Sequence, residues 1–424
     1  MRNNSASPLW SHSAAEPPLD AASGDVFEGP AEVALAVIGG GFTGLSTALH
    51  AAQKGLDCLV LEAQQIGHGG SGRNVGLVNA GLWLPPGAVR AKMGDSAGAR
   101  FVDYLGHAPA YVFDLIERHQ IRCDPRRNGT IHAAHSPRGF RDLQARAADW
   151  HALGAPVDLL DAEQTTRMTG TMQFHGGLLD HRAGTINPEG YTRGLARAAR
   201  AAGARIATGT EVTALERKGD HWHLATPKVR VRARNVVIGT NAYSGALWPA
   251  LRDSFTPISF FQLATAPLGA EAAHILPGGQ GLWTTARVMA SLRRDADGRI
   301  IIGSMGSISP GLSHRWANRM LQRLFPELPP LGFEAAWHGT IAFTPDHLPR
   351  IHRLADGLYT PMGYNGRGIT TGTLFGKALA DLLTGTPEQD LPLPLTTPQA
   401  DAMRHLKAPF YRLGFALNQL VKAI

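Results

Sequence analysis

The feature that most constrains the fold of this chain is an apolar strand that runs directly into a glycine-rich turn. Residues 34–38 are apolar, and Gly39-Gly40-Gly41-Phe42-Thr43-Gly44 follows them at once. A helical stretch and a second apolar strand, which ends in Glu62, complete the pattern. Strand, glycines, helix, strand and acid in this order are typical of a βαβ unit that binds a dinucleotide. A bound adenine dinucleotide is therefore the first hypothesis.

Each residue of this pattern has a mechanical reason. Gly39 permits the tight turn, Gly41 lets backbone amides reach a pyrophosphate, and Gly44 lets the helix pack closely against the sheet. The pyrophosphate is expected at the N-terminus of the helix that begins near Phe42, where unpaired amides and the helix dipole favour negative charge. Glu62 lies close to the interval of about 20 residues expected for the carboxylate that binds a ribose 2′-hydroxyl, and an acid there disfavours NADP. The pattern alone does not separate FAD from NAD.

A second glycine-bearing segment follows Glu62 and reads AQQIGHGGSGRN over residues 63–74. The small residues Gly69, Gly70, Ser71 and Gly72 let the backbone pass close to a ligand. Arg73 and Asn74 can donate hydrogen bonds to phosphate or ring oxygens. An ordinary glycine-rich surface loop is the alternative interpretation of this segment.

The segments GGGFTGLSTALHAAQKG and VLEAQQIGHGGSGRN resemble the D-amino-acid-oxidase-like flavoproteins, in particular their amine-oxidising branch. Further matching segments keep the family's order along most of the chain, and they cover residues 8–14, 177–180, 183–188, 235–242, 343–349 and 363–368. The resemblance implies a Rossmann-like FAD-binding domain, a βαβ unit with a central parallel sheet, and a substrate domain built on a mostly antiparallel sheet. The expected fold class is thus α/β plus α+β.

The resemblance also implies how the cofactor is held. The segment 363–368 is expected to turn into a helix over residues 369–383, whose N-terminus points at the flavin pyrimidine in this family. Some relatives attach the flavin through a cysteine in the C-terminal third, where this chain has none, so non-covalent FAD is expected and a histidyl linkage stays open. The expected FAD-binding residues are Gly39, Gly41, Phe42, Thr43, Gly44, Glu62, Ser71, Gly72, Arg73, Asn74, Val212, Gly239, Gly363, Tyr364, Asn365, Gly366 and Gly368.

By the same resemblance, the chain is expected to be an FAD-dependent amine or amino-acid oxidase or dehydrogenase. A hydride passes from the C–H beside a neutral amine nitrogen to flavin N5, water hydrolyses the imine, and oxygen or an electron carrier is the acceptor. Such a reaction depends on residues that position the substrate, so catalytic contacts are expected from Arg73, Asn74, Tyr364 and Asn365. The alternatives are a non-catalytic or partner-dependent flavin-binding subunit of a dehydrogenase complex and an NAD-linked dehydrogenase.

The sequence departs from the family in the region expected near the flavin ring. Relatives often carry Gly-Gly after the arginine–asparagine pair, whereas this chain has Val75-Gly76 and then an apolar run over residues 82–86. The mouth of the pocket is therefore expected to be narrower or more apolar. Trp83 is a candidate for its wall, and Arg293 is a candidate for holding a substrate carboxylate.

A length of 424 residues, of which 44% are hydrophobic, predicts two domains with sizeable cores. Residues 1–30 are expected to be an extended segment. The expected FAD-binding domain is discontinuous and covers residues 31–100, 185–256 and 340–395, and the expected substrate domain covers residues 101–184 and 257–339.

Residues 396–424 are expected to form a C-terminal helix, because apolar side chains recur there at helical spacing. Docking of this apolar stripe onto the enzyme or a second subunit is the first interpretation. Peripheral contact with a membrane surface is the alternative, with Lys407, Arg412 and Lys422 near the lipid headgroups. The stripe consists of Phe410, Leu413, Leu417, Leu420, Val421 and Ile424.

Composition excludes several other classes of protein. The net charge of +7 does not indicate nucleic-acid binding, because the arginines are scattered and no basic run of five or more occurs. The sequence has no uncharged apolar run of about 18 residues, so no transmembrane segment is predicted. The first 30 residues lack the apolar core of a signal peptide, so a cytoplasmic location is expected. The 18 histidines form no metal-binding motif, and no metal is expected.

Overall fold

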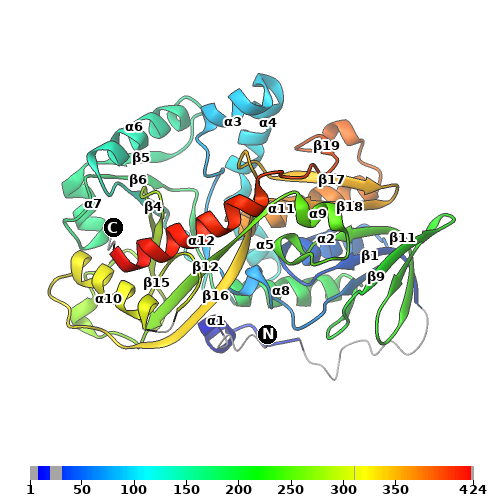
Figure 1. Ribbon diagram of the computed structural model, residues 1–424, viewed down its shortest axis with the longest axis horizontal. Helices are drawn as coiled ribbons and strands as arrows, with labels where there is room; N and C mark the ends of the chain where they lie inside the picture. Colours follow the sequence, from blue (N-terminus) through cyan, green and yellow to red (C-terminus); the bar gives the residue numbers. More distant parts are fainter. Residues whose placement is uncertain (1–7, 20–30, 310, 422–424) are drawn as a thin grey trace.

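The computed structural model describes residues 8–19, 31–309 and 311–421. The described chain forms two bodies side by side, each built on one large β-sheet (Figure 1). The long strands β12 (Thr256–Thr265) and β16 (Phe333–Phe343) belong to the body at the left of the figure. The strands β1 (Ala31–Ile38) and β11 (Arg230–Ile238) belong to the body at the right.

The sheet of the right-hand body has nine strands and a parallel centre. Its main order is β19-β17-β18-β11-β1-β2-β8, and a β9–β10 hairpin extends from β11. β1 pairs in parallel with both β11 and β2, and β2 pairs in parallel with β8. The other strands are β2 (Cys58–Leu61), β8 (Arg205–Ala207), β9 (Ala214–Lys218), β10 (His221–Ala225), β17 (Arg350–Ala355), β18 (Leu358–Met362) and β19 (Leu395–Thr396).

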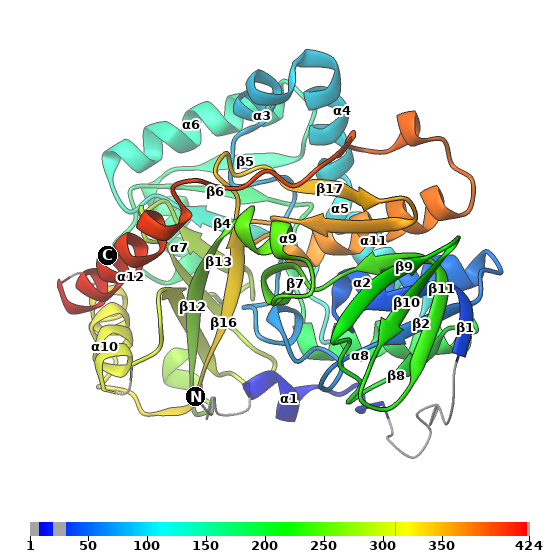
Figure 2. The ribbon, with the colours of Figure 1, turned by 45° about the vertical axis from the view of Figure 1, so that its right-hand side comes forward.

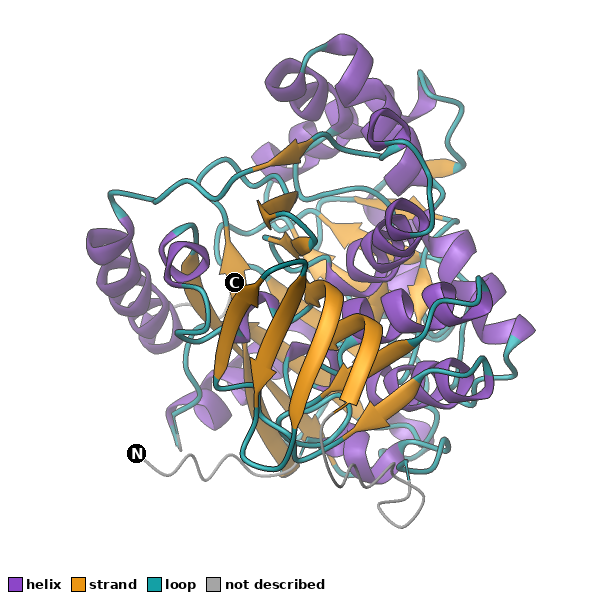
Figure 3. Ribbon diagram, turned by 90° about the vertical axis from the view of Figure 1, so that its right-hand side faces the viewer, coloured by secondary structure: helices purple, strands orange, loops and turns teal. Residues whose placement is uncertain are grey.

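Both faces of this sheet are covered, which explains why its central strands are apolar throughout. Leu35 and Val37 of β1 belong to a core shared with the helices, whereas Ala36 and Ile38 belong to a core shared with the β9–β10 hairpin. Figure 3 shows the strands in orange with helices in purple gathered to one side. The helices are α2 (Phe42–Gln53), α5 (Ala108–Arg118), α8 (Pro188–Ala201) and α11 (Gly368–Leu383).

The sheet of the left-hand body has eight strands in the order β16-β12-β15-β14-β13-β4-β6-β5. Neighbouring strands in this sheet are antiparallel, except for β13 and β4, which are parallel. Helix α10 (Leu312–Leu324) covers one side and buries Trp316 against Phe261 of β12. The remaining elements are β4 (Thr130–Ala133), α6 (Pro137–His151), β5 (Val157–Leu160), α7 (Ala162–Thr169), β6 (Gly177–Asp180), β13 (Gly281–Thr284), β14 (Ala290–Arg294) and β15 (Ile300–Met305).

The expected fold class, a parallel-centred α/β sheet beside a mostly antiparallel one, is confirmed. The strands of the two large sheets fall largely within the ranges expected for the two domains, but several elements cross the boundaries. Helix α5 packs on α11 although it lies in the range expected for the substrate domain. β12 begins at Thr256, β16 continues to Phe343, and α4 (Asp95–Gly106) spans the boundary at residue 100. Helix α3 (Pro86–Met93), which precedes α4, lies in the range expected for the FAD-binding domain. It nevertheless packs on α6 of the other domain, where the Gly87 amide donates to Asp149.

The N-terminal segment is not wholly extended. Residues 9–13 form a short helix, α1 (Leu9–Ser13), while residues 1–7 and 20–30 lie outside the described residues. Trp10 of α1 is buried, packs edge-on against Trp337, and donates from Nε1 to the backbone carbonyl of Asn74 at 2.8 Å. The segment therefore pins the loop that follows Gly72.

The C-terminal helix docks through a different face from the one expected. Helix α12 (Arg404–Val421), the red ribbon of Figures 1 and 2, packs against β12 and α10. Its buried anchor is Gln419, whose amide group contacts Ser307 and Ser313. The apolar stripe is exposed instead, with Phe410 at 69% exposure. The docked face also carries Tyr411 and Phe415, which pack against an apolar cluster that includes Phe260 and Met305. Lys422 and Ile424 lie outside the described residues.

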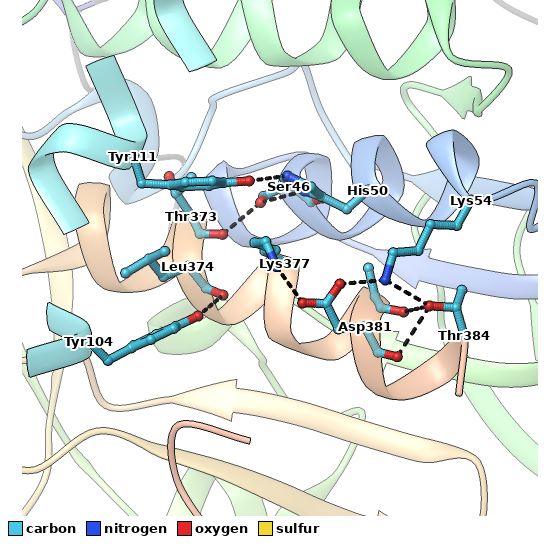
Figure 4. A network of polar contacts seen from close by, with 11 residues as sticks. Ser46, His50, Lys54, Tyr104, Tyr111, Thr373, Leu374, Lys377, Asp381 and Thr384 are labelled. Carbon is cyan, nitrogen blue, oxygen red and sulfur yellow. Dashed lines mark hydrogen bonds and ion pairs between the residues drawn. The ribbon is translucent and has the colours of Figure 1, made fainter. Parts of the chain in front are cut away.

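Helices α2 and α11 pack against each other closely enough that small residues are required. A Cβ atom at Gly376 would lie 2.6 Å from the backbone oxygen of Thr43, and one at Gly372 would lie 2.9 Å from the Thr43 hydroxyl oxygen. Polar contacts extend this packing along the helices (Figure 4), where Lys54 donates to Asp381 at 2.6 Å. Because α2 and α11 are fixed to each other, so are their N-termini. No helix in the described chain is long and apolar enough to cross a membrane.

Candidate active site

One cavity of about 630 Å³ lies between the two sheets. Its lining at the end near the parallel sheet comes from the glycine-rich turn, Glu62 and Val212. At the other end, it comes from strands of the antiparallel sheet and from the start of α11. Residues from this second end include Phe260, Gln262, Trp283, Met289, Ser291, Ser304, Met305, Ile341 and Arg367. A single cavity thus spans the two bodies.

The glycine-rich turn leaves no room for side chains. Gly39 has φ +106°, a conformation that favours glycine. A Cβ atom at Gly44 would lie 1.9 Å from the Gly39 backbone oxygen, so this glycine allows α2 to approach β1. Gly41 precedes α2, and the Phe42 amide donates to the Ser71 hydroxyl at 3.0 Å. Gly39, Gly41, Phe42 and Thr43 line the cavity, as sequence reasoning expects, and Gly44 stands behind them.

Glu62 lies where β2 ends and lines the same end of the cavity. One carboxylate oxygen accepts from the Gly40 amide at 2.6 Å, and the other accepts from the Gln64 amide at 2.8 Å. These bonds fix the carboxylate beside the glycine-rich turn. Val212 and Gly239 line the cavity nearby, so the residues expected at the adenosine end are brought together.

Some residues of the second glycine-bearing segment line the cavity, and others hold the surrounding structure in place. Ser71 and Asn74 line the cavity, whereas Gly72 and Arg73 do not belong to its lining. A Cβ atom at Gly72 would lie 2.0 Å from a Glu189 carboxylate oxygen, so this glycine serves packing. The Arg73 guanidinium donates to the backbone oxygens of His68 and His338. Arg73 therefore joins the loop to β16, and the expectation that it contacts the ring is not supported by its position.

Asn74 holds its own loop while it lines the cavity. Its side-chain nitrogen donates to the backbone oxygens of Gly70 and Ser71, and its side-chain oxygen accepts from the Gly76 amide at 2.9 Å. Both ends of the amide are thus occupied by backbone groups. We therefore expect Asn74 to shape the wall of the cavity.

The turn before α11 adopts left-handed backbone conformations at Gly363, Asn365 and Gly366, with φ values of +75°, +48° and +90°. Tyr364, Gly366 and Gly368 line the cavity. Asn365 does not belong to the lining; its side chain is buried and exchanges hydrogen bonds with Thr344. Gly363 also stands outside the lining. Asn365 is thus a support for the turn, a correction to its expected catalytic contact.

Of the two residues expected in the substrate pocket, one lines the cavity and the other does not. Trp83 lines the cavity, as sequence reasoning expects. Arg293 is buried, but its guanidinium donates to the backbone oxygens of Val75 and Ile186 and does not belong to the lining. The position of Arg293 therefore does not support the expectation that it holds a substrate carboxylate.

Sequence reasoning missed several residues that line the far end of the cavity. Arg367 stands in the turn before α11, inside a segment that the family resemblance had already marked. Trp283 and Gln262 come from β13 and β12, where no motif points to them. The available signal was the position of each residue within an apolar strand. Successive side chains of a strand point to opposite faces of the sheet, so a polar or aromatic residue among apolar ones can face a cavity.

The lining residues fit FAD. The tight turn, the N-terminus of α2 and the Glu62 carboxylate suit a pyrophosphate and a ribose. The long cavity continues to a second helix N-terminus, that of α11, where an electron-rich ring is stabilised. Cys58 and Cys123 are both buried and neither lines the cavity. The site thus has the form of an FAD site in a two-domain oxidoreductase.

Comparison with known proteins defines the class. The fold is similar to that of a crystal structure of glycine oxidase from Geobacillus kaustophilus, with a TM-score of 0.70 and 22% identity, covering 86% of this chain and 99% of that one. Residues 34–382 match the family described as FAD dependent oxidoreductase, DAO. The chain belongs to this family, and FAD is its cofactor. An NAD-linked dehydrogenase is thereby excluded.

Curated relatives cover nearly the whole chain. Gamma-glutamylputrescine oxidoreductase of Escherichia coli (strain K12) is 30% identical over 393 residues, which are 91% of this chain and 92% of the relative. Probable oxidoreductase OrdL of Rhizobium meliloti (strain 1021) is 29% identical over 396 residues, which are 92% of this chain and 89% of the relative.

Proposed function

We propose that this protein oxidises an amine or amino acid at the carbon beside nitrogen. The observation that carries the proposal is the single cavity that joins the FAD-binding turn to a pocket on the antiparallel sheet. FAD, when bound, supplies the hydride acceptor, and water then hydrolyses the imine product. The relative from Escherichia coli, named for gamma-glutamylputrescine, supports an amine as the substrate.

The residues of the pocket orient the substrate and exclude water. Phe260, Met289, Met305 and Ile341 supply an apolar lining from four different segments. Gln262 adds a polar group, since its side-chain oxygen is buried without a hydrogen-bond partner in the described chain. An amide oxygen accepts from N–H groups, so Gln262 is suited to hold a neutral amine. Substitution Gln262→Leu is expected to raise KM for the amine while the FAD content stays unchanged.

The acceptor and the binding of the cofactor belong to the same proposal. We expect oxygen or an electron carrier to reoxidise the flavin, and we expect FAD to be non-covalent. Precipitation with acid should release all flavin into the supernatant, whereas flavin retained in the pellet contradicts a non-covalent cofactor. Hydrogen peroxide formed in air indicates oxygen as acceptor. Turnover only with an artificial electron acceptor indicates a carrier, and flavin reduction that requires a second protein indicates a partner-dependent subunit.

The exposed side of α12 supports a peripheral contact with an anionic membrane surface of the cytoplasm. Phe410, Leu413 and Leu417 are exposed on it, and Arg412 adds a positive charge nearby. Residues 404–421 include no Asp or Glu. Cosedimentation with anionic phospholipid vesicles, lost on Leu413→Gln, is the expected result. Protein that stays in the supernatant, or that forms dimers through this helix, contradicts the membrane contact.

A further inference from the structure

Buried polar contacts hold the N-terminal segment, residues 8–19, on the enzyme. Glu16 of this segment is 1% exposed. One of its carboxylate oxygens accepts from Arg197 Nε at 2.5 Å, and the other accepts from the backbone amide of Arg122 at 3.0 Å. A buried carboxylate costs free energy unless it is paired and hydrogen-bonded, and here it is both. The segment therefore has a defined position in the folded chain.

Three side chains hold consecutive backbone carbonyls in the loop that follows Gly72. The carbonyl oxygens of residues 73, 74 and 75 accept, in that order, from Trp337 Nε1 at 2.8 Å, Trp10 Nε1 at 2.8 Å and the Arg293 guanidinium at 3.2 Å. Trp10 also contacts the other two donors. Its ring centre lies 5.8 Å from that of Trp337 and 5.2 Å from the guanidinium carbon of Arg293. The N-terminal segment thus supplies the middle one of the three donors.

The carbonyls held in this way point away from the cavity. Trp10, Trp337 and Arg293 do not belong to its lining, whereas Asn74 and Val75 do. The peptide bonds of the described chain are trans, so each N–H group points away from the carbonyl of its own peptide. The amides of Asn74 and Val75 therefore lie on the cavity side of the loop. Their direction depends on the carbonyls that Trp337 and Trp10 hold.

A second set of contacts joins the N-terminal segment to another part of the same glycine-bearing loop. Glu189 of α8 is buried, and a Cβ atom at Gly72 would lie 2.0 Å from its carboxylate, so this carboxylate rests on the loop backbone. Arg193 donates to the Glu189 carboxylate at 3.0 Å. The same guanidinium donates to the backbone oxygens of Glu16 and Ser11, at 3.2 and 3.3 Å. The N-terminal segment is therefore connected to the loop at two separate points.

We propose that the N-terminal segment is part of the FAD site, and that Trp10 is a positioning residue that holds the amides of Asn74 and Val75 towards the bound cofactor. When the loop leaves this position in a fraction of the molecules, the apparent affinity for FAD falls accordingly. By thermodynamic linkage, bound FAD in turn stabilises the segment on the enzyme. Occupancy of the cofactor site is thereby coupled to residues 8–19, none of which belongs to the lining of the cavity.

The variant Trp10→Phe keeps an aromatic ring in place and removes the N–H donor. Its matched control is Trp222→Phe, because Trp222 is also buried, lies outside the cavity lining, and donates from Nε1 to the backbone oxygen of Asp356 at 3.0 Å. Titration of FAD into FAD-free protein, followed by flavin fluorescence, measures the dissociation constant. Trp10→Phe is expected to raise this constant about twofold to fivefold, as the net value of one hydrogen bond allows, and Trp222→Phe should leave it unchanged.

Hydrogen exchange tests the reciprocal effect of FAD on the N-terminal segment. Amide exchange in residues 8–19 is measured by mass spectrometry on wild-type protein with and without FAD. FAD is expected to slow this exchange, because the bound cofactor makes local opening of the segment less favourable. The slowing should be smaller in Trp10→Phe and unchanged in Trp222→Phe. Helix α10, which contributes no residue to the cavity lining, is the internal control and should exchange alike in both states.

Three results would overturn the proposal. The first is an FAD affinity that Trp10→Phe leaves unchanged, and the second is an equal loss of affinity in Trp10→Phe and Trp222→Phe. The third is exchange in residues 8–19 that FAD does not alter, or alters only as much as it alters exchange in α10. The comparison with and without FAD needs no substitution, so a poorly folded variant does not block the test.

Discussion

The hydroxyl groups of Thr43 and Tyr364 lie 2.7 Å apart inside the protein, although 321 positions separate the two residues in the sequence. Thr43 belongs to the first turn of α2, and Tyr364 belongs to the turn that leads into α11. Both residues line the cavity. The bond therefore joins the two helix N-termini that are expected to face opposite parts of the same cofactor.

Removing this hydrogen bond should weaken the junction between the two helices. Thr43→Val and Tyr364→Phe are each expected to lower the free energy of unfolding by about 1 kcal/mol, the usual net value of a buried hydrogen bond. The double variant should cost less than the sum of the single ones, because neither hydroxyl is left unpaired. Chemical denaturation of the four proteins measures this coupling, and strictly additive effects would contradict it.

The close approach of α2 and α11 predicts a strong effect of one methyl group. In Gly376→Ala, the new Cβ would lie 2.6 Å from the Thr43 backbone oxygen and 2.7 Å from the Ser46 Cβ. Overpacking of this kind typically costs about 1–3 kcal/mol of unfolding free energy. Gly414→Ala is the matched control, because that helical position on α12 has nothing within 4 Å. The control should be neutral or stabilising, and equal effects at both positions would refute the packing argument.

Glu62 should contribute to the affinity for FAD. Glu62→Gln removes the charge that is expected to accept from the ribose, so we predict a dissociation constant for FAD raised about tenfold or more, as for the loss of a charged hydrogen bond. Quenching of FAD fluorescence on addition of FAD-free protein measures the constant. Glu211→Gln makes the same change of charge at an exposed position of the same cavity end, and it should have the smaller effect.

The features of the fold that the sequence predicts correctly depend on residues that lie close together in the chain. The glycine-rich turn and Glu62 could be predicted because a tight turn and a close helix require particular residues at fixed spacing. The surroundings of Arg367 could not be predicted, since its two tryptophan neighbours come from positions 83 and 283 and only the folded chain brings them together. Helical spacing showed which residues of α12 share a face, but not that Gln419 on another face finds polar partners on the enzyme.

Stability should depend on pH through His50 of α2. The Nδ1 atom of His50 donates to the Ser46 carbonyl at 2.6 Å, because a carbonyl oxygen only accepts, and Nε2 then accepts from the Tyr111 hydroxyl. Burial lowers the pKa of His50 to about 4, so native His50 stays neutral where the unfolded chain already takes up a proton. The unfolding free energy should therefore fall as the pH falls from about 6.5 to 4, by up to about 3 kcal/mol from this group.

The variant His50→Gln isolates this contribution. The difference in unfolding free energy between wild-type protein and the variant should shrink as the pH is lowered from neutral towards 4, since only the wild-type protein loses stability through this imidazole. Denaturation curves at several pH values provide the measurement. A difference that stays constant with pH would show that His50 titrates alike in both states.

The central claim is that this FAD-dependent oxidoreductase oxidises an amine. The most direct test is the visible spectrum of the FAD-loaded protein, recorded without oxygen as amines, γ-glutamyl amines and N-methyl amino acids are added in turn. The account predicts two flavin bands that bleach with at least one of these amines and return when an acceptor is admitted. Flavin bands that no amine bleaches, in protein that chemical reductants do bleach, would contradict it.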